Sequence, residues 1–282
     1  MLFRSQQHVV TAGRGQLVNL ILSTYECAVQ QNRELIATQA ELNRSNEQLR
    51  DQQEKLRLAN EQFESPQYKR ILSLPLNEKR AQVYTLQKAF WNLNRRDCWG
   101  LAQGVAPMDV KKLIWEHEED ELAGNKTRGV EDHYSLQVRQ SKEIHLTLED
   151  FKNEKPREAT LTCNYAWLHL VRSSSWLTAV ASCAALEVSN SSDWVSGGGM
   201  SYRMGKRFES ELGIPFHKQL NAAEHHEVDV MHGSLMMQVV ERHAMTQAKL
   251  DEVMTGLIES WQIDRVWKGQ LAEMMEAVPY SR

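Results

Sequence analysis

Histidine and aspartate recur at helical spacing near residue 230. His225, Asp229 and His232 stand at positions i, i+4 and i+7, which places the three side chains on one face of a helix. Imidazole nitrogens and a carboxylate oxygen that converge on one point suit iron, manganese or zinc. Four residues further on, the same stripe reaches Met236 and becomes apolar. We interpret the cluster as metal-binding; the alternative is a polar helix end with surface histidines.

A carboxylate ends the most apolar stretch of the chain. Glu187 follows the run from Trp176 to Leu186, and by helical spacing it shares a face with Val180 and Cys183. Burying a carboxylate on such a face costs on the order of several kcal/mol unless it is paired or binds a metal ion. Glu187 is therefore a second candidate ligand, with a helix-end glutamate that reaches water as the alternative.

An acidic run at residues 118–121 crosses a helical stripe that is otherwise apolar. By spacing, Glu118 and Glu121 lie on the stripe and His117 lies beside it, while His133 follows further along the chain. Such a run is more often a solvated surface than a binding site. It becomes a candidate ligand segment only together with the two places described above.

Combined, the three places have the composition of a dinuclear non-heme iron centre inside a helical bundle. The usual motif of such centres is Glu-x-x-His on two helices. The expected helices lack it, apart from the overlapping cluster at residues 224–232. An ordinary ferritin-like site is therefore disfavoured.

These residues are expected to lie on helices of an all-α fold. From about residue 78 apolar residues recur at helical spacing, and the alternation typical of strands is absent. A bundle is the default way to bury such stripes. The expected helices are Glu78–Asn94, Pro107–Leu122, His133 to about His145, Ala159–Ser173, Ser174–Val188, Tyr202–Leu212, Ala222–His243 and Gln247–Met275.

The segment 30–63 differs from the rest of the chain. It contains no glycine or proline and repeats a leucine every seven residues, at Leu35, Leu42, Leu49 and Leu56. A repeat of seven favours a supercoiled partner helix, although the polar residues three before each leucine weaken it. We expect a long helix that either forms a homodimer or packs on its own body; a solvated helix is the other interpretation.

Two domains follow from this pattern. The pair Ser65-Pro66 ends the long helix, because the residue before proline is pushed out of the α region, and a loop follows. We expect an N-terminal helical extension over residues 1–65 and a metal-binding helical bundle over residues 78–282.

The spacing His225-x3-Asp229-x2-His232 resembles the third core helix of the heme-oxygenase-like diiron oxidases. That superfamily also contains the pyrroloquinoline-quinone synthase and the thiaminase-like proteins. The similarity covers about residues 80–275 and includes Trp194 to Gly199, which is similar to proteins described as iron-containing redox enzymes. The resemblance implies a heme-oxygenase-like helical bundle, here preceded by the coiled-coil-like helix.

The resemblance also implies a ligand set for two Fe(II) ions. Carried onto this sequence, the ligands are Glu118 or Glu121, then His133, Glu187, His225, Asp229 and His232. In many relatives the first Glu and His stand closer together than Glu121 and His133 do here, so residues 124–129 form an insertion. An insertion that displaces His133 would leave a mononuclear or incomplete site.

The function that follows is a non-heme iron oxidase or oxygenase that uses O2 as co-substrate to oxidise a small organic substrate, with manganese as an alternative metal. The sequence does not select the substrate. A metal-free pyrroloquinoline-quinone-synthase-like protein is one alternative, although adjacent carboxylates would repel an acidic substrate. A thiaminase-like hydrolase with Cys183 as nucleophile is another. The third is a non-enzymatic oligomeric helical scaffold or sensor.

Net charge, hydrophobicity and cysteine spacing limit the classes of partner and the cellular compartment that we expect. The 282 residues carry a net charge of −4, which does not suggest a nucleic-acid partner or an anionic membrane. No apolar run reaches the roughly 20 residues that span a bilayer. The four cysteines are widely spaced, so we expect free thiols and a cytoplasmic location.

Overall fold

The computed structural model describes residues 2–3, 6–7, 13–125 and 129–280. Side chains are described in these ranges except at residues 2–3, 6–7, 47–48, 51–52, 54–55 and 225–234. Contacts within the chain group it into two compact units, Met1–Glu54 and Lys55–Arg282.

The first unit contains a short hairpin and most of one long helix. Strand β1 (Leu2–Phe3) pairs antiparallel with β2 (Gln6–Gln7), which no alternating pattern in the sequence had indicated. Helix α1 (Arg14–Glu64) begins in this unit and ends in the second. The repeated leucines from Leu35 to Leu49 remain 51–67% exposed. This stripe therefore has no partner within the described part of its own unit.

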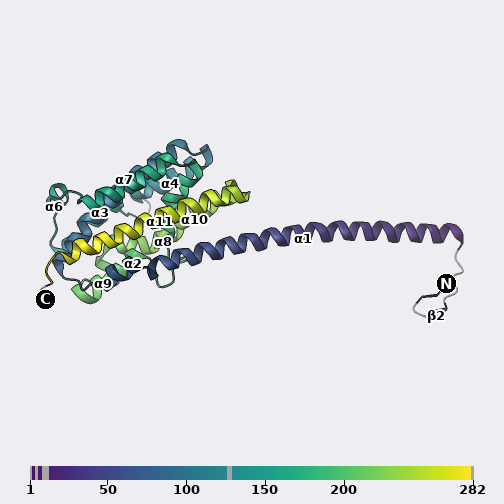
Figure 1. The fold of residues 1–282 in the computed structure, drawn as a ribbon, viewed down its shortest axis with the longest axis horizontal. Helices are drawn as coiled ribbons and strands as arrows, with labels where there is room; N and C mark the ends of the chain where they lie inside the picture. The colour runs from purple at the N-terminus through teal and green to yellow at the C-terminus, as the bar shows by residue number, and fades with distance from the viewer. Residues whose placement is uncertain (1, 4–5, 8–12, 126–128, 281–282) are drawn as a thin grey trace. The chain divides into compact units, whose positions relative to one another are not determined.

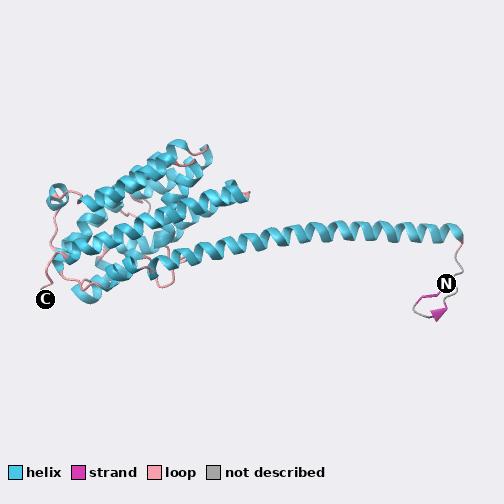
Figure 2. Ribbon diagram, in the orientation of Figure 1, coloured by secondary structure: helices cyan, strands magenta, loops and turns pink. Residues whose placement is uncertain are grey.

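The second unit is all-α in the described part of the chain, as the sequence predicts (Figures 1 and 2). Its helices, of which the two η segments are 3-10 helices, are α2 (Pro66–Ser73), α3 (Glu78–Val105), α4 (Met108–Ala123), α5 (His133–Gln140), η1 (Ser141–Ile144), α6 (Leu148–Asn153), α7 (Glu158–Ser173), α8 (Trp176–Asn190), α9 (Met200–Leu212), η2 (Phe216–Lys218), α10 (Leu220–His243) and α11 (Gln247–Glu276). Helices α3, α7, α8, α10 and α11 pack together as a bundle.

Helix α8 lies at the centre of this bundle. It is apolar on every side, and all its residues from Leu177 to Ser189 are buried, as expected for a helix without a polar face. Helix α11 packs closely against it, since a Cβ atom at Gly256 would lie 2.4 Å from the carbonyl oxygen of Thr178. The indole Nε1 of Trp261 on α11 also donates to the Ser189 hydroxyl at 2.7 Å. These contacts fix the helix that carries Glu187.

The segment after Ser65 is a helix rather than the expected loop. The Ser65 side chain caps the first turn of α2 by accepting from the Tyr68 amide at 3.4 Å, and Pro66 takes the first helical position. Proline suits that position because its missing N–H would lack a helical partner anyway. The prediction used proline only as a helix terminator and missed that it also begins the next helix.

Helix α3 is longer than predicted. The expected end was Asn94, but Cys98, Trp99 and Ala102 continue the buried stripe beyond it. The helix therefore runs on to Val105 and carries Arg95 and Arg96 into the interior. These additional turns place both arginines next to buried carboxylates.

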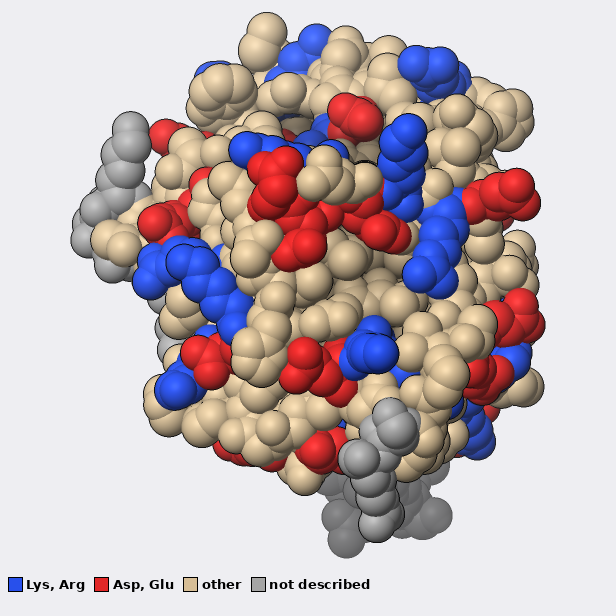
Figure 3. Space-filling view, turned by 90° about the vertical axis from the view of Figure 1, so that its left-hand side faces the viewer, with Lys and Arg blue, Asp and Glu red and all other residues tan. Residues whose placement is uncertain are grey.

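Charged side chains of both signs are interspersed over the surface shown in Figure 3. Solvation at the surface is the usual situation for an acidic residue, so buried acids require an explanation. Among the described residues, no helix combines the length and hydrophobicity of a membrane span.

Candidate metal centre

Helix α4 brings polar side chains into the core along a stripe that starts apolar. Val110 and Ile114 are fully buried in its first turns, and His117, Glu118 and Glu121 continue the buried face. The start of α4 is tied to the end of α10, where Nε2 of His243 lies 2.8 Å from Oδ2 of Asp109. The packing that buries the apolar turns thereby buries the polar ones.

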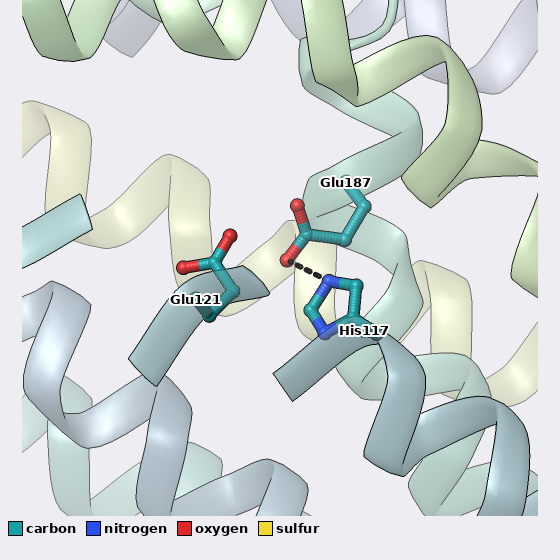
Figure 4. Close-up of side chains that lie close together, drawn as sticks. All are labelled: His117, Glu121 and Glu187. Carbon is teal, nitrogen blue, oxygen red and sulfur yellow. Dashed lines mark ion pairs between the residues drawn. The ribbon is translucent and has the colours of Figure 1, made fainter. Parts of the chain in front are cut away.

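His117, Glu121 and Glu187 form a compact cluster between α4 and α8. One ligand atom from each lies within 4.8 Å of the other two, and all three residues are buried. Within this trio, Nε2 of His117 lies 3.7 Å from Oε1 of Glu187 (Figure 4). Three donors at such separations can reach one metal ion placed between them.

Glu118 has a different role from Glu121. Its Oε1 lies 3.0 Å from Nδ1 of His117, so it holds the ring by the nitrogen that faces away from Glu187. A carboxylate on the far nitrogen of a metal-binding histidine fixes the ring and increases its basicity. Trp99 of α3 packs on the same imidazole, with ring centroids 4.9 Å apart. Glu119, the remaining glutamate of the acidic run, is exposed.

His133 lies next to the cluster, at the start of α5. It begins α5, whose first turn is capped by the Asp132 carboxylate accepting from the Ser135 amide at 2.9 Å. Nδ1 of His133 lies 2.9 Å from Oε1 of Glu121. The side-chain amide of Asn221 on α10 donates to the His133 carbonyl at 3.1 Å. His133 therefore lies beside Glu121.

Two arginines of α3 stand among the buried carboxylates. Arg95 donates to the Cys183 carbonyl and lies 3.2 Å from Glu187 Oε1. Nη1 of Arg96 lies 2.7 Å from Glu118 and 3.0 Å from Glu121. Burial lowers the pKa of the Arg96 guanidinium, but the surrounding carboxylates raise it more, so its pKa stands above the ordinary value.

The third predicted ligand group falls on α10. The backbone at His225, Asp229 and His232 is helical, as expected, while their side chains lie outside the described residues. Helix α10 packs against α8 and α5, the helices that carry Glu187 and His133. That packing puts α10 beside the cluster; the convergence of its three side chains on the cluster stays a prediction.

A small cavity of about 80 Å³, partly open to solvent, borders the cluster. Glu121, His133 and Glu187 lie in its wall together with the two arginines. The other lining residues are Lys88, Trp91, Asn92, Leu93, Leu122, Asp132, Tyr134, Asn190 and Ser201. The buried carboxylates are thus within reach of a small molecule that enters from outside.

The donor set fits iron. It mixes imidazole nitrogen with carboxylate oxygen, the combination that non-heme iron sites use. Three carboxylates, those of Glu118, Glu121 and Glu187, are each at most 10% exposed, so removing them from water needs positive charge nearby. The arginines supply part of that charge, and a metal ion would supply more.

The cysteine chemistry of a hydrolase finds no support. All four cysteines are free, as expected. Burial raises the pKa of the Cys183 thiol far above its ordinary value, with the smaller opposing effect of Arg95. A nucleophilic cysteine needs a thiolate near neutral pH. Cys183 is therefore a small core residue rather than a nucleophile.

Sequence reasoning missed His117 and both arginines. His117 stands four residues before Glu121, and two metal-binding side chains at i and i+4 share a helix face. That spacing was a usable signal, but the acidic residues around His117 suggested a solvated surface. Arg95 and Arg96 were placed beyond the expected end of their helix, so no signal pointed to them.

Solved structures with the same fold come from two bacteria. A CADD-like protein of unknown function from Nostoc punctiforme PCC 73102 shares 17% identity with a TM-score of 0.61, covering 79% of this chain and 97% of its own. A domain of unknown function with a heme oxygenase-like fold from Shewanella denitrificans OS217 shares 14% identity with a TM-score of 0.62. It covers 79% of this chain and 91% of its own. A comparison with curated proteins found no match.

The family comparison agrees with the fold. Residues 82–265 match the family model described as iron-containing redox enzyme. The matched range includes α4, α5 and α8, which carry His117, Glu121, His133 and Glu187, and also α10. The chain therefore belongs to the iron-containing redox enzyme family and has its heme-oxygenase-like fold.

Proposed function

We propose that the chain is a non-heme iron oxidase that binds Fe(II) at the buried cluster and uses O2 to oxidise a small organic molecule. The observation that supports this most is the cluster of His117, Glu121 and Glu187 in the wall of a cavity. Membership of the iron-containing redox enzyme family supports iron as the metal.

The residues that would hold iron come from three helices and one helix start. His117 and Glu121 belong to α4, His133 begins α5, and Glu187 lies near the end of α8. Helix α10 would add a second group of ligands, His225, Asp229 and His232. With that group the site has donors for two ions, in line with a diiron centre; manganese is the alternative metal.

Iron, when bound, supplies the electrons and the Lewis acidity that O2 chemistry requires. The residues of the chain orient the side chains that would bind the iron. Glu118 orients the His117 ring through Nδ1, and Arg95 holds Oε1 of Glu187. Burial of these groups limits their contact with bulk water and strengthens the electrostatic interactions among them.

The cavity gives the substrate a place next to the ligands. Its wall beyond the cluster offers hydrogen-bonding groups, including the Lys88 ammonium, which donates to the Ser201 hydroxyl at 3.4 Å. Trp91 and Leu93 supply apolar surface to the same cavity. Trp167, by contrast, is 1% exposed inside the bundle and is not among the residues that line the cavity.

Oxygen consumption tests this proposal. Protein reconstituted with Fe(II) under anaerobic conditions should consume O2 faster than the same amount of free Fe(II) when the two are mixed with aerated buffer. We expect Glu187→Gln to lower that rate by about tenfold or more, because it removes an anionic donor from the cluster. Glu131→Gln is the matched control, since Glu131 is exposed and pairs with Arg139. Equal rates for the wild type and Glu187→Gln would contradict the proposal.

A further inference from the structure

The guanidinium of Arg96 is already bound to the carboxylates that a metal ion would need. Its Nη1 lies 2.7 Å from Oε1 of Glu118 and 3.0 Å from Oε2 of Glu121. Its Nη2 lies 4.0 Å from Oε1 of Glu187. Arg96 therefore contacts both carboxylates of the trio that includes His117.

The Arg96 guanidinium and a metal ion would compete for the same carboxylate oxygens of Glu121 and Glu187. Glu121 uses one oxygen toward Arg96 and the other toward His133. Oε1 of Glu187 faces Arg95, Arg96 and the His117 ring at once. A guanidinium stays protonated in proteins, so it cannot make way by losing its charge. A metal ion that takes Glu121 and Glu187 must share these oxygens or displace Arg96.

Arg96 has a position to which it can withdraw. Its shortest ion pair is with Glu118, which orients His117 but does not belong to the trio. The Arg96 side chain keeps 15% exposure and borders the cavity, so it has space to move. Arg95 lacks that freedom, because it donates to the Cys183 carbonyl and its side chain is only 4% exposed.

We propose that Arg96 is an internal cation that competes with the metal ion for Glu121 and Glu187, and that it thereby sets the metal affinity of the centre. Binding of an ion moves the guanidinium toward Glu118, and loss of the ion lets it return to bridge the carboxylates. Without metal, the Arg96 guanidinium holds the carboxylates of the centre together, and this lowers the affinity of the centre for a metal ion. This inference rests on the proposed function, in that the centre must bind a metal ion.

The direction of the effect follows from charge. Arg96→Met replaces the arginine with an unbranched side chain that carries no charge. The carboxylates then repel one another until another cation binds. A divalent ion then binds without a competitor and relieves that repulsion. We expect Mn(II) to bind Arg96→Met at least about tenfold more tightly than the wild type, because the competing positive charge is gone.

The test is a Mn(II) titration of the full chain after removal of metal with a chelator. Isothermal calorimetry and the electron paramagnetic resonance signal of free Mn(II) both give affinity and ions per chain. Arg96→Lys should lie between the wild type and Arg96→Met, because an ammonium cannot bridge several carboxylates as a guanidinium does. Arg139→Met is the control, since Arg139 pairs with Glu131 at the surface; it should match the wild type.

The outcomes separate this inference from the proposed function. If no variant and no wild-type protein binds Mn(II), both are wrong. If the wild type binds Mn(II) and Arg96→Met and Arg96→Lys bind it no more tightly, only the role of Arg96 is wrong. Thermal melting guards against a variant that folds poorly: Mn(II) should raise the midpoint more for Arg96→Met than for the wild type. An equal rise would overturn the inference, and if Arg96→Met does not fold at all, Arg96→Lys decides.

Discussion

His117 has two ring nitrogens with different neighbours, and that difference defines its role. Nδ1 faces Glu118 at 3.0 Å, whereas Nε2 points toward Glu187 at 3.7 Å. The first contact selects the tautomer and orientation of the ring, and the second places the remaining nitrogen at the cluster. His133 makes a comparable approach to Glu121. The centre therefore has two imidazoles on the side formed by α4 and α5.

We predict that His117→Ala weakens Mn(II) or Fe(II) binding by about 10–100-fold, because it removes a donor and leaves Glu118 without its imidazole. Metal titration followed by calorimetry measures this. His169→Ala is the control, since His169 is an exposed histidine of α7 and should leave affinity unchanged. Unchanged affinity in His117→Ala beside a large loss in His133→Ala would make His133 the only imidazole ligand on this side.

Burial of the acids was favoured only when the three candidate places were taken together, and the identity of their partners was not predicted. Glu118, Glu121 and Glu187 each put a carboxylate on an apolar stripe, which is visible in the sequence. The two partners of an ion pair such as Arg96–Glu118, by contrast, stand on different helices. Helical spacing relates residues within one helix and says little about which helices face each other. The cation that faces these acids, Arg96, could therefore be identified only from the structure.

Helix α1 changes its surroundings along its length. Its leucine stripe is exposed in the first unit, and Leu56, the next residue of the repeat, is still 37% exposed. Phe63, seven residues further on, is 5% exposed and packs on Tyr68 with ring centroids 4.8 Å apart. Asn60 also donates to the Trp194 carbonyl at 2.9 Å. The last turns of α1 thus belong to the bundle, and the exposed leucines remain for another partner. We propose that this partner is a second copy of the chain.

Replacing two leucines of the stripe tests that proposal. We predict that the double variant Leu42→Lys/Leu49→Lys sediments as a monomer while the wild type sediments as a dimer, because lysine at both positions places like charges in the apolar seam. Analytical ultracentrifugation at micromolar concentration distinguishes the two. Ala37→Lys/Ala40→Lys changes exposed residues off the stripe and should stay dimeric. A monomeric wild type would rule out dimerisation through α1.

Helix positions were predicted better than helix ends. The periodic stripes that place α4, α7, α8 and α11 are strong because burial requires them. Ends depend on capping and on single residues, which carry weaker signals. The extension of α3 past Asn94 shows the consequence, since those extra turns carry the two arginines of the centre.

The whole molecule assembles its centre from segments far apart in the chain. Arg96, His117, His133 and Glu187 come from four helices, and α10 packs beside them. Helix α8 makes this assembly stable because its buried apolar surface holds α3, α10 and α11 together. The sequence predicted the class of fold from periodicity. The resemblance to a known superfamily, rather than periodicity, indicated which helices would meet.

Counting iron tests most directly whether the buried cluster holds the metal. Protein reconstituted anaerobically with Fe(II) and then desalted would be analysed for iron per chain, together with Glu121→Ala/Glu187→Ala and the exposed control Glu119→Ala/Glu131→Ala. We predict about two ions per chain in the wild type and the control, as in a diiron centre, and little iron in the cluster variant. An iron-free wild type, or a folded cluster variant that retains the wild-type amount, would contradict this.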